Sequence, residues 1–379
     1  MIKEHKRTPI TVIYGKDPST MTELLLSAIS LGSSIEQGSS IAIKPNLVVA
    51  SPSDGGGTTT PDIIEGIIRH LQAYGHKDIS VIESSWIGDS TKRAYKVCGY
   101  EHISRRTGVP MIDLKQDNTT QLEIEDRSYD VCRKALEADV LINVPVLKGH
   151  CQTRMTGALK NLKGCIPDSE KRRYHSLGLH QPIADINRLL KPDWIIMDAI
   201  CGDLSFEEGG DPSTMHRMIA GFDPVLIDSY GCALMGLSPK KVPYIMKAAE
   251  YGVGRLFDNN PQDIMELNSS DSSYELPRLT RKVNELSNQQ EACSACWGAL
   301  VRALMDIDDE LYERFLTLHE QRGTPLFAIG QGFSRSEAID CLLGIGSCTS
   351  AAEDNVSGCP PTPDQIRKHL ETLHSLPPG

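Results

Sequence analysis

Residues 138–147 read ADVLINVPVL, an almost unbroken apolar run that is typical of a strand buried on both faces of a sheet. Similar runs recur along the first two thirds of the chain, at 10–15, 40–47, 78–84, 192–200 and 223–229. Helical patterns are interspersed among these runs, at 19–31, 61–74, 91–98, 130–137, 179–190 and 227–235. Buried strands separated by helices predict an α/β fold with a mostly parallel sheet flanked by helices. Because ligands bind such sheets outside the carboxyl ends of the strands, polar residues that follow a run are candidate site residues.

Composition limits the classes of function. The chain has 379 residues, a net charge of −11 and an aromatic content of 5%. An acidic chain without a stripe of Lys and Arg is a poor match for nucleic acid. The first residues, MIKEHKRTPITVIYG, are charged and lack the apolar region of a signal peptide, and no apolar run reaches the roughly 18 residues of a membrane span. We therefore expect a cytoplasmic protein that binds neither nucleic acid nor membrane.

The length predicts more than one domain. We assign residues 1–257 to the α/β domain, 258–290 to a polar linker or peripheral excursion, and 291–379 to a small cysteine-rich α/β domain. In the small domain we expect helices at 297–305, 308–322 and 363–375, and a strand at 325–332.

The eleven cysteines are unevenly spaced, and five of them fall between residues 293 and 359. An odd number in a cytoplasmic chain disfavours a disulfide framework and favours metal or redox chemistry. Cys293 and Cys296 form a C-x-x-C pair, whereas Cys348 and Cys359 stand in Gly-Ser-Cys and Gly-Cys-Pro-Pro sequences. Proline directly after cysteine recurs at cluster ligands, and Gly-Cys-Pro-Pro before a helix resembles the last cluster ligand in the small electron-transfer subunits of hydrogenases and of respiratory complex I. We predict that Cys293, Cys296, Cys348 and Cys359 hold one iron–sulfur cluster, of the 4Fe-4S type.

Other interpretations of these cysteines stay open. Four thiolates also suit a structural zinc ion, and four buried cysteines could be inert. Cys341 is a reserve ligand that could replace one of the four. Four thiolates would saturate every iron of a 4Fe-4S cluster, so its expected role is single-electron transfer, whereas three would leave an iron open for Lewis-acid chemistry.

The stretch from Pro145 to Gly164 is the richest polar segment of the large domain. It places Lys148, His150, Arg154, Lys160 and Lys163 directly after an apolar run of an otherwise acidic chain. Such local positive charge favours a carboxylate, a phosphate or an anionic cofactor.

Two further polar elements flank predicted strands and helices. Thr58, Thr59 and Thr60 precede Pro61, which suits the first turn of the helix at 61–74, with Thr60 as its N-cap. Glycines and threonines at a helix N-terminus can bind an anion. Asp198 ends the run at 192–200, and Asp228 is expected to cap the helix at 227–235.

Together these loops resemble the domain of unknown function family number 362. The matching pieces are Lys44-Pro45-Asn46-Leu47, Thr58 to Pro61, Glu83-Ser84, Leu147 to His150, Thr156 to Gly164, His175, Met197-Asp198, Gly221 to Pro224 and Asp228. The resemblance implies an iron–sulfur context and a shared site, but no substrate. Members often carry a ferredoxin-like segment with the run C-x-x-C-x-x-C-x-x-x-C-P, which this chain lacks, so one cluster is expected and not two.

Our first hypothesis is an iron–sulfur oxidoreductase or electron-transfer component that acts on an anionic small molecule or cofactor. The candidate binding residues are Lys44, Asn46, Thr58, Thr59, Thr60, Glu83, Thr156, Lys160, Asn161 and Lys163, and the candidate catalytic residues are Lys148, His150, His175 and Asp198. Histidine suits acid–base work because it titrates near neutrality. Expected partners are a redox protein such as a ferredoxin and a second copy of the chain in a homodimer. A flavin stays open as an electron partner, although no phosphate-binding fingerprint marks one.

Two alternatives belong to other classes. The chain could be a non-redox metal-dependent isomerase, lyase or transferase with a structural zinc site, in which Lys148, His150 and Asp198 do the chemistry. It could also be a factor that delivers a cluster or an anionic cofactor to a partner. Iron, sulfide and zinc content separates the first hypothesis from the second.

Overall fold

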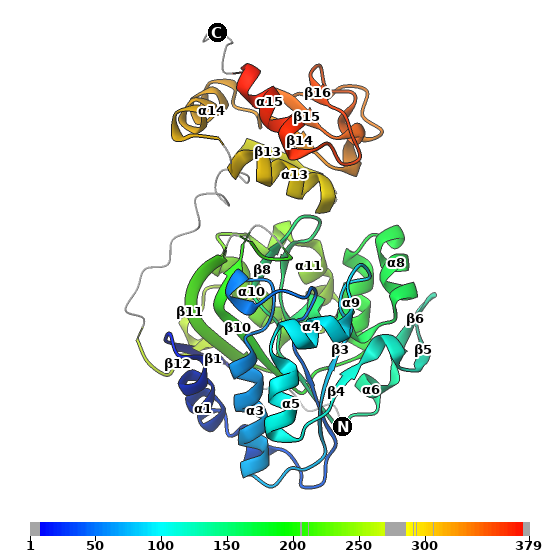
Figure 1. Ribbon diagram of the computed structural model, residues 1–379, viewed down its shortest axis with the longest axis vertical. Helices are drawn as coiled ribbons and strands as arrows, with labels where there is room; N and C mark the ends of the chain where they lie inside the picture. Colours follow the sequence, from blue (N-terminus) through cyan, green and yellow to red (C-terminus); the bar gives the residue numbers. More distant parts are fainter. Residues whose placement is uncertain are drawn as a thin grey trace. The chain divides into compact units, whose positions relative to one another are not determined.

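The computed structural model describes residues 8–204, 207–210, 212–269, 286–290, 292, 294–305 and 307–373. The chain forms two compact units, a large one of residues 1–149 and 153–274 and a small one of residues 150–152 and 275–379. Each unit is described by itself below (Figure 1). Among the helices of the described residues, none combines the length and the apolar character that crossing a bilayer requires.

The large unit is built on an eight-stranded sheet with the order β12-β1-β11-β10-β7-β2-β3-β4. Its strands are β1 (Ile10–Tyr14), β2 (Ile41–Lys44), β3 (Ile79–Glu83), β4 (Met111–Asp113), β7 (Val140–Asn143), β10 (Trp194–Asp203), β11 (Pro212–Gly221) and β12 (Ile264–Glu266). Only β11 runs antiparallel to its neighbours β1 and β10, and the other pairs are parallel. The prediction of an α/β fold with a mostly parallel sheet is therefore confirmed.

Two groups of helices flank this sheet (Figure 1). The first group is α1 (Pro18–Ala28), α2 (Leu31–Ser34), α3 (Pro61–Ala73), α4 (Thr91–Val97) and α5 (Tyr100–Thr107), and the second comprises α7 (Ala158–Asn161), α8 (Asp168–Leu177), α9 (His180–Leu189), α10 (Pro224–Leu234) and α11 (Pro243–Glu250). In α3, Ile63, Ile64, Ile67, Ile68 and Leu71 form one fully buried stripe. Apolar residues with this helical spacing bury one face of a helix against a sheet.

Smaller elements complete the large unit. The antiparallel hairpin of β5 (Thr119–Ile124) and β6 (Arg127–Cys132) leads into α6 (Arg133–Leu136), and β8 (Lys148–His150) pairs with β9 (Arg154–Thr156). Short 3-10 turns occur at Ser53–Gly55, Leu114–Gln116, Leu162–Cys165, Pro239–Lys241 and Pro261–Asp263. Edge strand β12 lies inside the predicted excursion 258–290, and residues 270–285 of that stretch lie outside the described residues.

The structure corrects two predictions. The prediction of a strand at 223–229 is wrong, because Asp223 is the N-cap of helix α10 and the residues after it belong to that helix. Asp223, and not Asp228, caps α10, since its Oδ1 accepts the backbone N–H of Val225 and of Leu226, both at 2.9 Å. The sequence analysis also missed β11 and the β5–β6 hairpin.

The small unit holds a four-stranded parallel sheet with the order β13-β14-β15-β16. Its strands are β13 (Ser287–Gln289), β14 (Phe327–Ile329), β15 (Leu343–Ile345) and β16 (Asn355–Val356). Its helices are α13 (Ser294–Met305), α14 (Asp309–Arg322) and α15 (Pro363–Leu373), with 3-10 turns at Gln331–Phe333 and Ser347–Thr349. The three helices fall close to their predicted positions.

Candidate functional site

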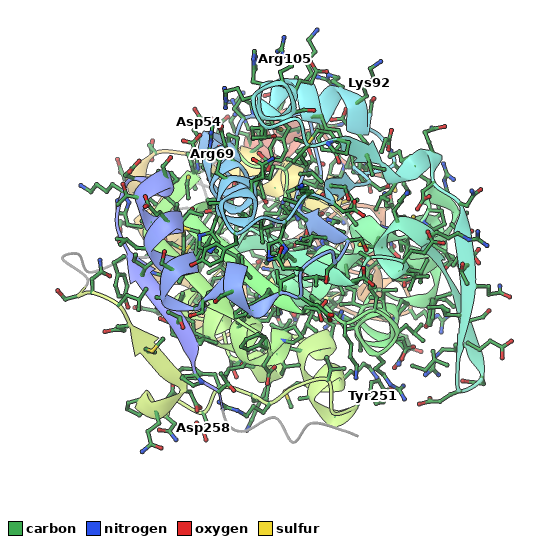
Figure 2. The ribbon with its side chains drawn as sticks, turned by 90° about the horizontal axis from the view of Figure 1, so that it is seen from below. Asp54, Arg69, Lys92, Arg105, Tyr251 and Asp258 are labelled. Atoms are coloured by element: carbon green, nitrogen blue, oxygen red, sulfur yellow. The ribbon has the colours of Figure 1, made fainter. Side chains whose placement is uncertain are left out.

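Four buried lysines gather in the large unit. Lys44, Lys148, Lys160 and Lys171 expose 1%, 0%, 4% and 5% of their surface, whereas basic residues such as Lys92 and Arg105 are exposed and lie at the edge of the molecule in Figure 2. Lysine is almost never fully buried unless it is paired. The partners of these four lysines therefore define the candidate site.

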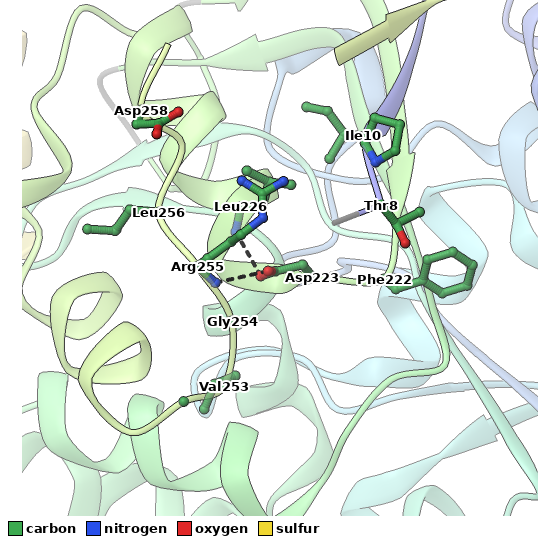
Figure 3. A pocket seen from close by; sticks show the side chains of 12 residues that line it. Thr8, Ile10, Phe222, Asp223, Leu226, Val253, Gly254, Arg255, Leu256 and Asp258 are labelled. Carbon is green, nitrogen blue, oxygen red and sulfur yellow. Dashed lines mark hydrogen bonds between the residues drawn. The ribbon is translucent and has the colours of Figure 1, made fainter. Parts of the chain in front are cut away.

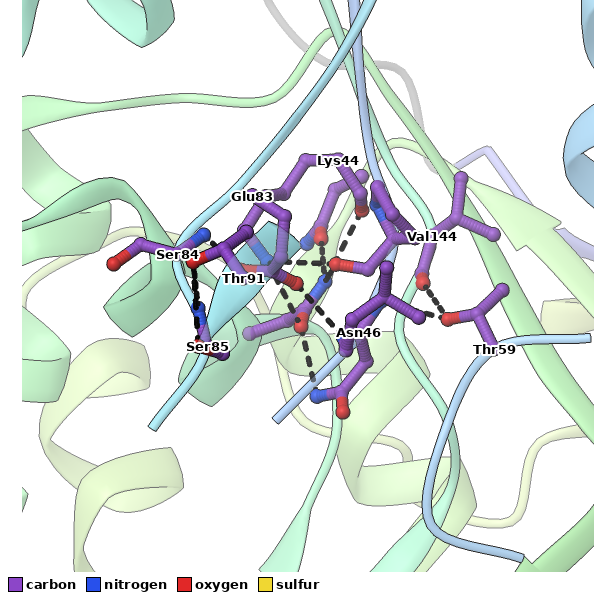
Figure 4. A network of polar contacts seen from close by, with 12 residues as sticks. Lys44, Asn46, Thr59, Glu83, Ser84, Ser85, Thr91 and Val144 are labelled. Atoms are coloured by element: carbon purple, nitrogen blue, oxygen red, sulfur yellow. Dashed lines mark hydrogen bonds and ion pairs between the residues drawn. The ribbon is translucent and has the colours of Figure 1, made fainter. Parts of the chain in front are cut away.

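The site begins where three neighbouring strands end. Lys44, Glu83 and Asn143 are the last residues of β2, β3 and β7, and Lys44 lies opposite Asn143 in the register. The Lys44 ammonium donates to Glu83 Oε2 at 2.9 Å and to the carbonyl of Pro45 at 2.7 Å (Figure 4). Glu83 also accepts the backbone N–H of Leu47 at 2.8 Å. The buried charges are thus compensated by each other and by backbone groups, as their burial requires.

Asparagine side chains join this pair to the rest of the site. Asn161, the last residue of α7, accepts from Asn46 at 2.9 Å and donates to Asn143 at 2.7 Å. Its Oδ1 also lies 3.4 Å from Lys44 Nζ. The predicted residues Lys44, Asn46, Glu83 and Asn161 therefore form one connected network, and Asn143 is a member that the sequence analysis missed.

Lys148 lies at the start of β8 and has a full set of acceptors. Its ammonium donates to Asn46 Oδ1 at 3.0 Å, to the carbonyl of Gly57 at 2.5 Å and to the carbonyl of Glu207 at 2.7 Å. Burial lowers the pKa of Lys148 to about 7, with a smaller contribution from Lys160 in the same direction. An ammonium has three N–H donors, and Lys148 uses them to hold three segments together. These are the loop at Gly57, the β10–β11 connection at Glu207, and Asn46 just after β2.

Lys160 lies one residue before Asn161 and is held differently. Its ammonium donates to Thr156 Oγ1 at 3.2 Å and forms an ion pair with the carboxylate of Glu207. Glu207 was not among the predicted site residues, because the sequence shows only an acidic loop without indicating which carboxylate turns inward.

The threonine loop and Asp198 organise the backbone. Thr59 Oγ1 donates to the carbonyl of Val144 at 2.9 Å and accepts the N–H of Asn46 at 2.7 Å, and Thr58 donates to Ser51 O at 2.8 Å. Thr60 is the N-cap of α3, as predicted, and its backbone N–H donates to Asp198 Oδ2 at 2.9 Å. Burial raises the pKa of Asp198, and the hydrogen bonds from Thr60 oppose this shift. That the threonines bind a ligand and that Asp198 acts in catalysis stay predictions.

The predicted histidines and Lys163 lie around these loops. His150 is buried, and its Nδ1 accepts the backbone N–H of Gln152 at 3.0 Å inside its own turn. His175 is an exposed residue of α8. The pKa of His175 is lowered to about 4, mainly because the surrounding protein removes part of its hydration. The charges of Lys163 and Lys160 lower it further. His175 is therefore neutral at pH 7, the form that can accept a proton.

Asp228 positions the helix that carries Lys160. From inside α10, its carboxylate accepts the backbone N–H groups of Ala158 and Leu159 at 2.6 and 3.0 Å, which caps the short helix α7. Burial raises the pKa of Asp228 to about 7. A Cβ atom on Gly157 would lie 2.2 Å from Asp228 Oδ1, so the glycine is needed for this approach.

The small unit brings together the loops that carry the predicted cluster ligands. Cys348 follows β15 and Cys359 follows β16, and the two loops are joined because the N–H of Ser347 donates to the carbonyl of Gly358 at 2.9 Å. A Cβ atom on Gly346 would lie 3.0 Å from Cys296 Sγ and 3.5 Å from the carbonyl of Gly358. Cys296, in the first turn of α13, therefore lies beside the two adjacent loops that carry Cys348 and Cys359 at the carboxyl edge of this sheet.

Cys293 lies outside the described residues, and within the part of the chain that the structure describes, no three His, Cys, Asp or Glu side chains are grouped as a metal site. Cys341 is buried and precedes β15, whereas Cys348 follows it. A strand of three residues spans roughly 10 Å, so Cys341 lies at the opposite edge of the sheet from the other cysteines.

A large cavity lies elsewhere in the large unit (Figure 3). It has a volume of about 590 Å³ and is lined by Ile10, Phe222, Asp223 and the segment 252–256, among others. Ile10 is the first residue of β1, so this cavity is at the amino edge of the parallel strands and not at the edge where the buried lysines gather. Arg255 lines it, but its guanidinium is paired with Asp263 at 2.7 and 2.8 Å.

Comparison with known proteins places the lysine site in a family. A family model described as "Domain of unknown function (DUF362)" matches residues 41–233, about half of the chain. The chain belongs to this family. The DUF362 match begins at the first residue of β2 and ends within α10, so it contains all four buried lysines and none of residues 275–379. The family resemblance expected from the sequence is confirmed.

Two individual proteins are similar to this DUF362 chain. The thylakoid-associated protein sll1697 of Synechocystis sp. is 23% identical over 246 residues, which are 62% of this chain and 75% of that protein. The solved structure of the lactate racemase apoprotein from Thermoanaerobacterium thermosaccharolyticum aligns with a TM-score of 0.38 and 10% identity, over 65% of this chain and 57% of its own.

Proposed function

We propose that this DUF362 protein is an iron–sulfur oxidoreductase or electron-transfer component whose small unit carries one 4Fe-4S cluster. The ligands are Cys293, Cys296, Cys348 and Cys359. The observation that carries the proposal is the meeting of the Cys296, Cys348 and Cys359 segments at one edge of a small parallel sheet. A cluster with four thiolate ligands supplies single-electron transfer.

The loops around these cysteines fit such a group. Gly346 has φ +93°, and its missing side chain leaves the space that Cys296 Sγ approaches. The carbonyl of Gly346 accepts from Thr349 Oγ1 at 2.9 Å and from Asn355 Nδ2 at 3.0 Å, so it is turned into the protein and fixed there. Cys359 is exposed and Cys348 is partly exposed. Cluster ligands near the surface suit exchange of electrons with a protein such as a ferredoxin.

In the large unit the buried lysines supply a binding site for an anionic molecule. Among the described residues, the contacts of Lys160 leave one of its N–H donors for a ligand, whereas Lys44 and Lys148 hold the surrounding loops. His175, whose pKa is lowered by desolvation and by the charges of Lys163 and Lys160, would be the proton acceptor for a bound molecule in this proposal.

Metal content and spectra of protein purified without oxygen test the cluster. We expect a brown protein with about four iron and four sulfide ions per chain, because each of the four cysteines would bind one iron. Reduction should bleach the visible absorbance and give an electron paramagnetic resonance signal. A colourless protein with one zinc ion would contradict the proposal and support a structural zinc site.

Cysteine variants assign the ligands. Cys348→Ala and Cys359→Ala should each lose the visible absorbance, while the circular dichroism of the large unit is kept. Cys341→Ala is the matched control, since it removes a thiol of the same small unit from the opposite edge of the sheet and should keep the absorbance. If Cys348→Ala retained the spectrum of the unaltered protein, the assigned ligand set would be wrong.

A further inference from the structure

Lys160 differs from the other buried lysines in its unused hydrogen-bonding capacity. Among the described residues, its ammonium has two partners, Thr156 Oγ1 and the Glu207 carboxylate, which leaves one of its three N–H donors over. The Thr156 hydroxyl accepts from Lys160, and its own O–H has no acceptor in the described part of the chain. Lys148, in contrast, uses all its donors on three oxygen atoms.

The partner of Lys160 is the more accessible half of the ion pair. The side chain of Glu207 is 25% exposed, whereas that of Lys160 is 3% exposed. Glu207 lies between β10 and β11, and its main-chain carbonyl is held separately by Lys148 at 2.7 Å. Displacement of the carboxylate from Lys160 would therefore leave the contact between the Glu207 carbonyl and Lys148 in place.

We propose that the Glu207 carboxylate stands in the position of a ligand carboxylate, and that Lys160 and Thr156 bind a small carboxylate anion. This inference rests on the anion-binding role proposed above for the large unit and names its ligand class. A carboxylate has two oxygen atoms. One would take the contact that Glu207 now makes, and the other could accept from the remaining N–H of Lys160 or the O–H of Thr156.

The geometry favours a carboxylate over a phosphate. Among the described residues, Lys160 is the lysine with one N–H donor left over at this position, and the group it already binds is a planar carboxylate of single charge. A phosphate dianion would need further cations with free donors, and Lys148 next to it has none left. The internal Glu207 competes with any ligand, so the unaltered protein should bind free carboxylates weakly.

Acetate binding by three variants tests the proposal, with isothermal titration calorimetry as the readout. Glu207→Gln should bind acetate about tenfold more tightly than the unaltered protein, because the internal competitor is gone. Glu208→Gln is the matched control, since it removes the same charge from the next residue, and its affinity should stay within about twofold of the unaltered protein. The double variant Lys160→Gln/Glu207→Gln should lose the gain.

Other outcomes overturn the proposal. Equal acetate affinities for Glu207→Gln and Glu208→Gln would show that the affinity depends on net charge alone and not on the Glu207 contact with Lys160. Tighter binding of inorganic phosphate than of acetate would contradict the assignment of a carboxylate as the ligand. If Glu207→Gln does not fold, Glu207→Asp is measured in its place, and failure of both to fold would show that Glu207 is structural and not displaceable. Acetate binding should be unchanged in Cys359→Ala, so failure here and failure of the cluster assignment are separate results.

Discussion

Gly164→Ala tests whether the Lys44–Glu83 ion pair fixes the stability of the large unit. A Cβ atom at this position would lie 2.3 Å from Glu83 Oε1, 2.4 Å from Lys44 Cε and 2.5 Å from Lys44 Nζ. Ordinary contacts of a Cβ atom are 3.4–4 Å long, so the pair would have to move by roughly 1 Å. Both side chains are buried, and neither can swing into solvent.

The size of the effect follows from the contacts at risk. A shift of that size would break or weaken the Lys44–Glu83 bond of 2.9 Å and the Leu47 N–H bond of 2.8 Å to the same oxygen. Separating a buried ion pair costs about 3–5 kcal/mol, and overpacking alone costs about 1–3 kcal/mol. The lower backbone entropy of alanine in the unfolded chain returns about 0.4–1 kcal/mol. We therefore expect the free energy of unfolding to fall by about 3 kcal/mol or more.

Urea unfolding followed by tryptophan fluorescence measures this change. The chain has three tryptophans, of which Trp297 lies in the small unit, so the measurement is made in a Trp297→Phe background that reports the large unit alone. The midpoint should fall by about 1 M or more. Gly55→Ala is the matched control, because a Cβ atom there would meet only Ser51 Oγ, at an ordinary 3.6 Å. If Gly164→Ala and Gly55→Ala unfolded at the same urea concentration, the reasoning about the ion pair would be refuted.

Three titrations supply further predictions. Burial lowers the pKa of Lys148 from 10.5 to about 7, so between pH 7 and 10.5 the unfolded chain binds one proton more than the folded chain. The free energy of unfolding should therefore rise with pH in this range, by about 1.4 kcal/mol per pH unit. Urea unfolding of the unaltered protein and of Lys148→Met, as the reference, measures this difference. Burial raises the pKa of Asp228 from 3.8 to about 7, so the folded state binds the extra proton, and stability relative to Asp228→Asn should fall by about the same amount per unit as pH rises through that window. The pKa of His175 is lowered to about 4, and its ring signals in a nuclear magnetic resonance titration should shift near pH 4; a midpoint near 6.5 would contradict the environment described for it.

The sequence predicted the edge of the sheet at which the buried lysines of the candidate site lie, but not which atoms meet there. Lys44 and Glu83 were found because each directly follows an apolar run, and chain direction then places them at one edge of a parallel sheet. The acceptors of Lys148 could not be found in this way, since the carbonyls of Gly57 and Glu207 belong to the backbone. Every residue has a carbonyl, so the residue type carries no signal of such a contact.

The errors in the fold have similarly local causes. A run as short as Val225 to Ile227 does not distinguish a strand from a buried helix by its periodicity. The preceding Asp223-Pro224 pair was the better signal, because Asp is a preferred N-cap and Pro suits the first helical position. Strand β11 was missed since exposed and buried residues alternate over its first half, which breaks the apolar run that identified the other strands.

The two units place their polar residues by the same physical means. In the large unit, Lys44, Glu83 and Asn143 end three neighbouring strands, and in the small unit Cys348 and Cys359 follow two neighbouring strands. Parallel strands bring together residues that are far apart in sequence, because all their carboxyl ends meet at one edge. This rule also separates Cys341 from Cys348, although only six residues lie between them, since β15 runs from one to the other. Position relative to strand direction, and not spacing along the chain, therefore decides which of these cysteines can lie close together.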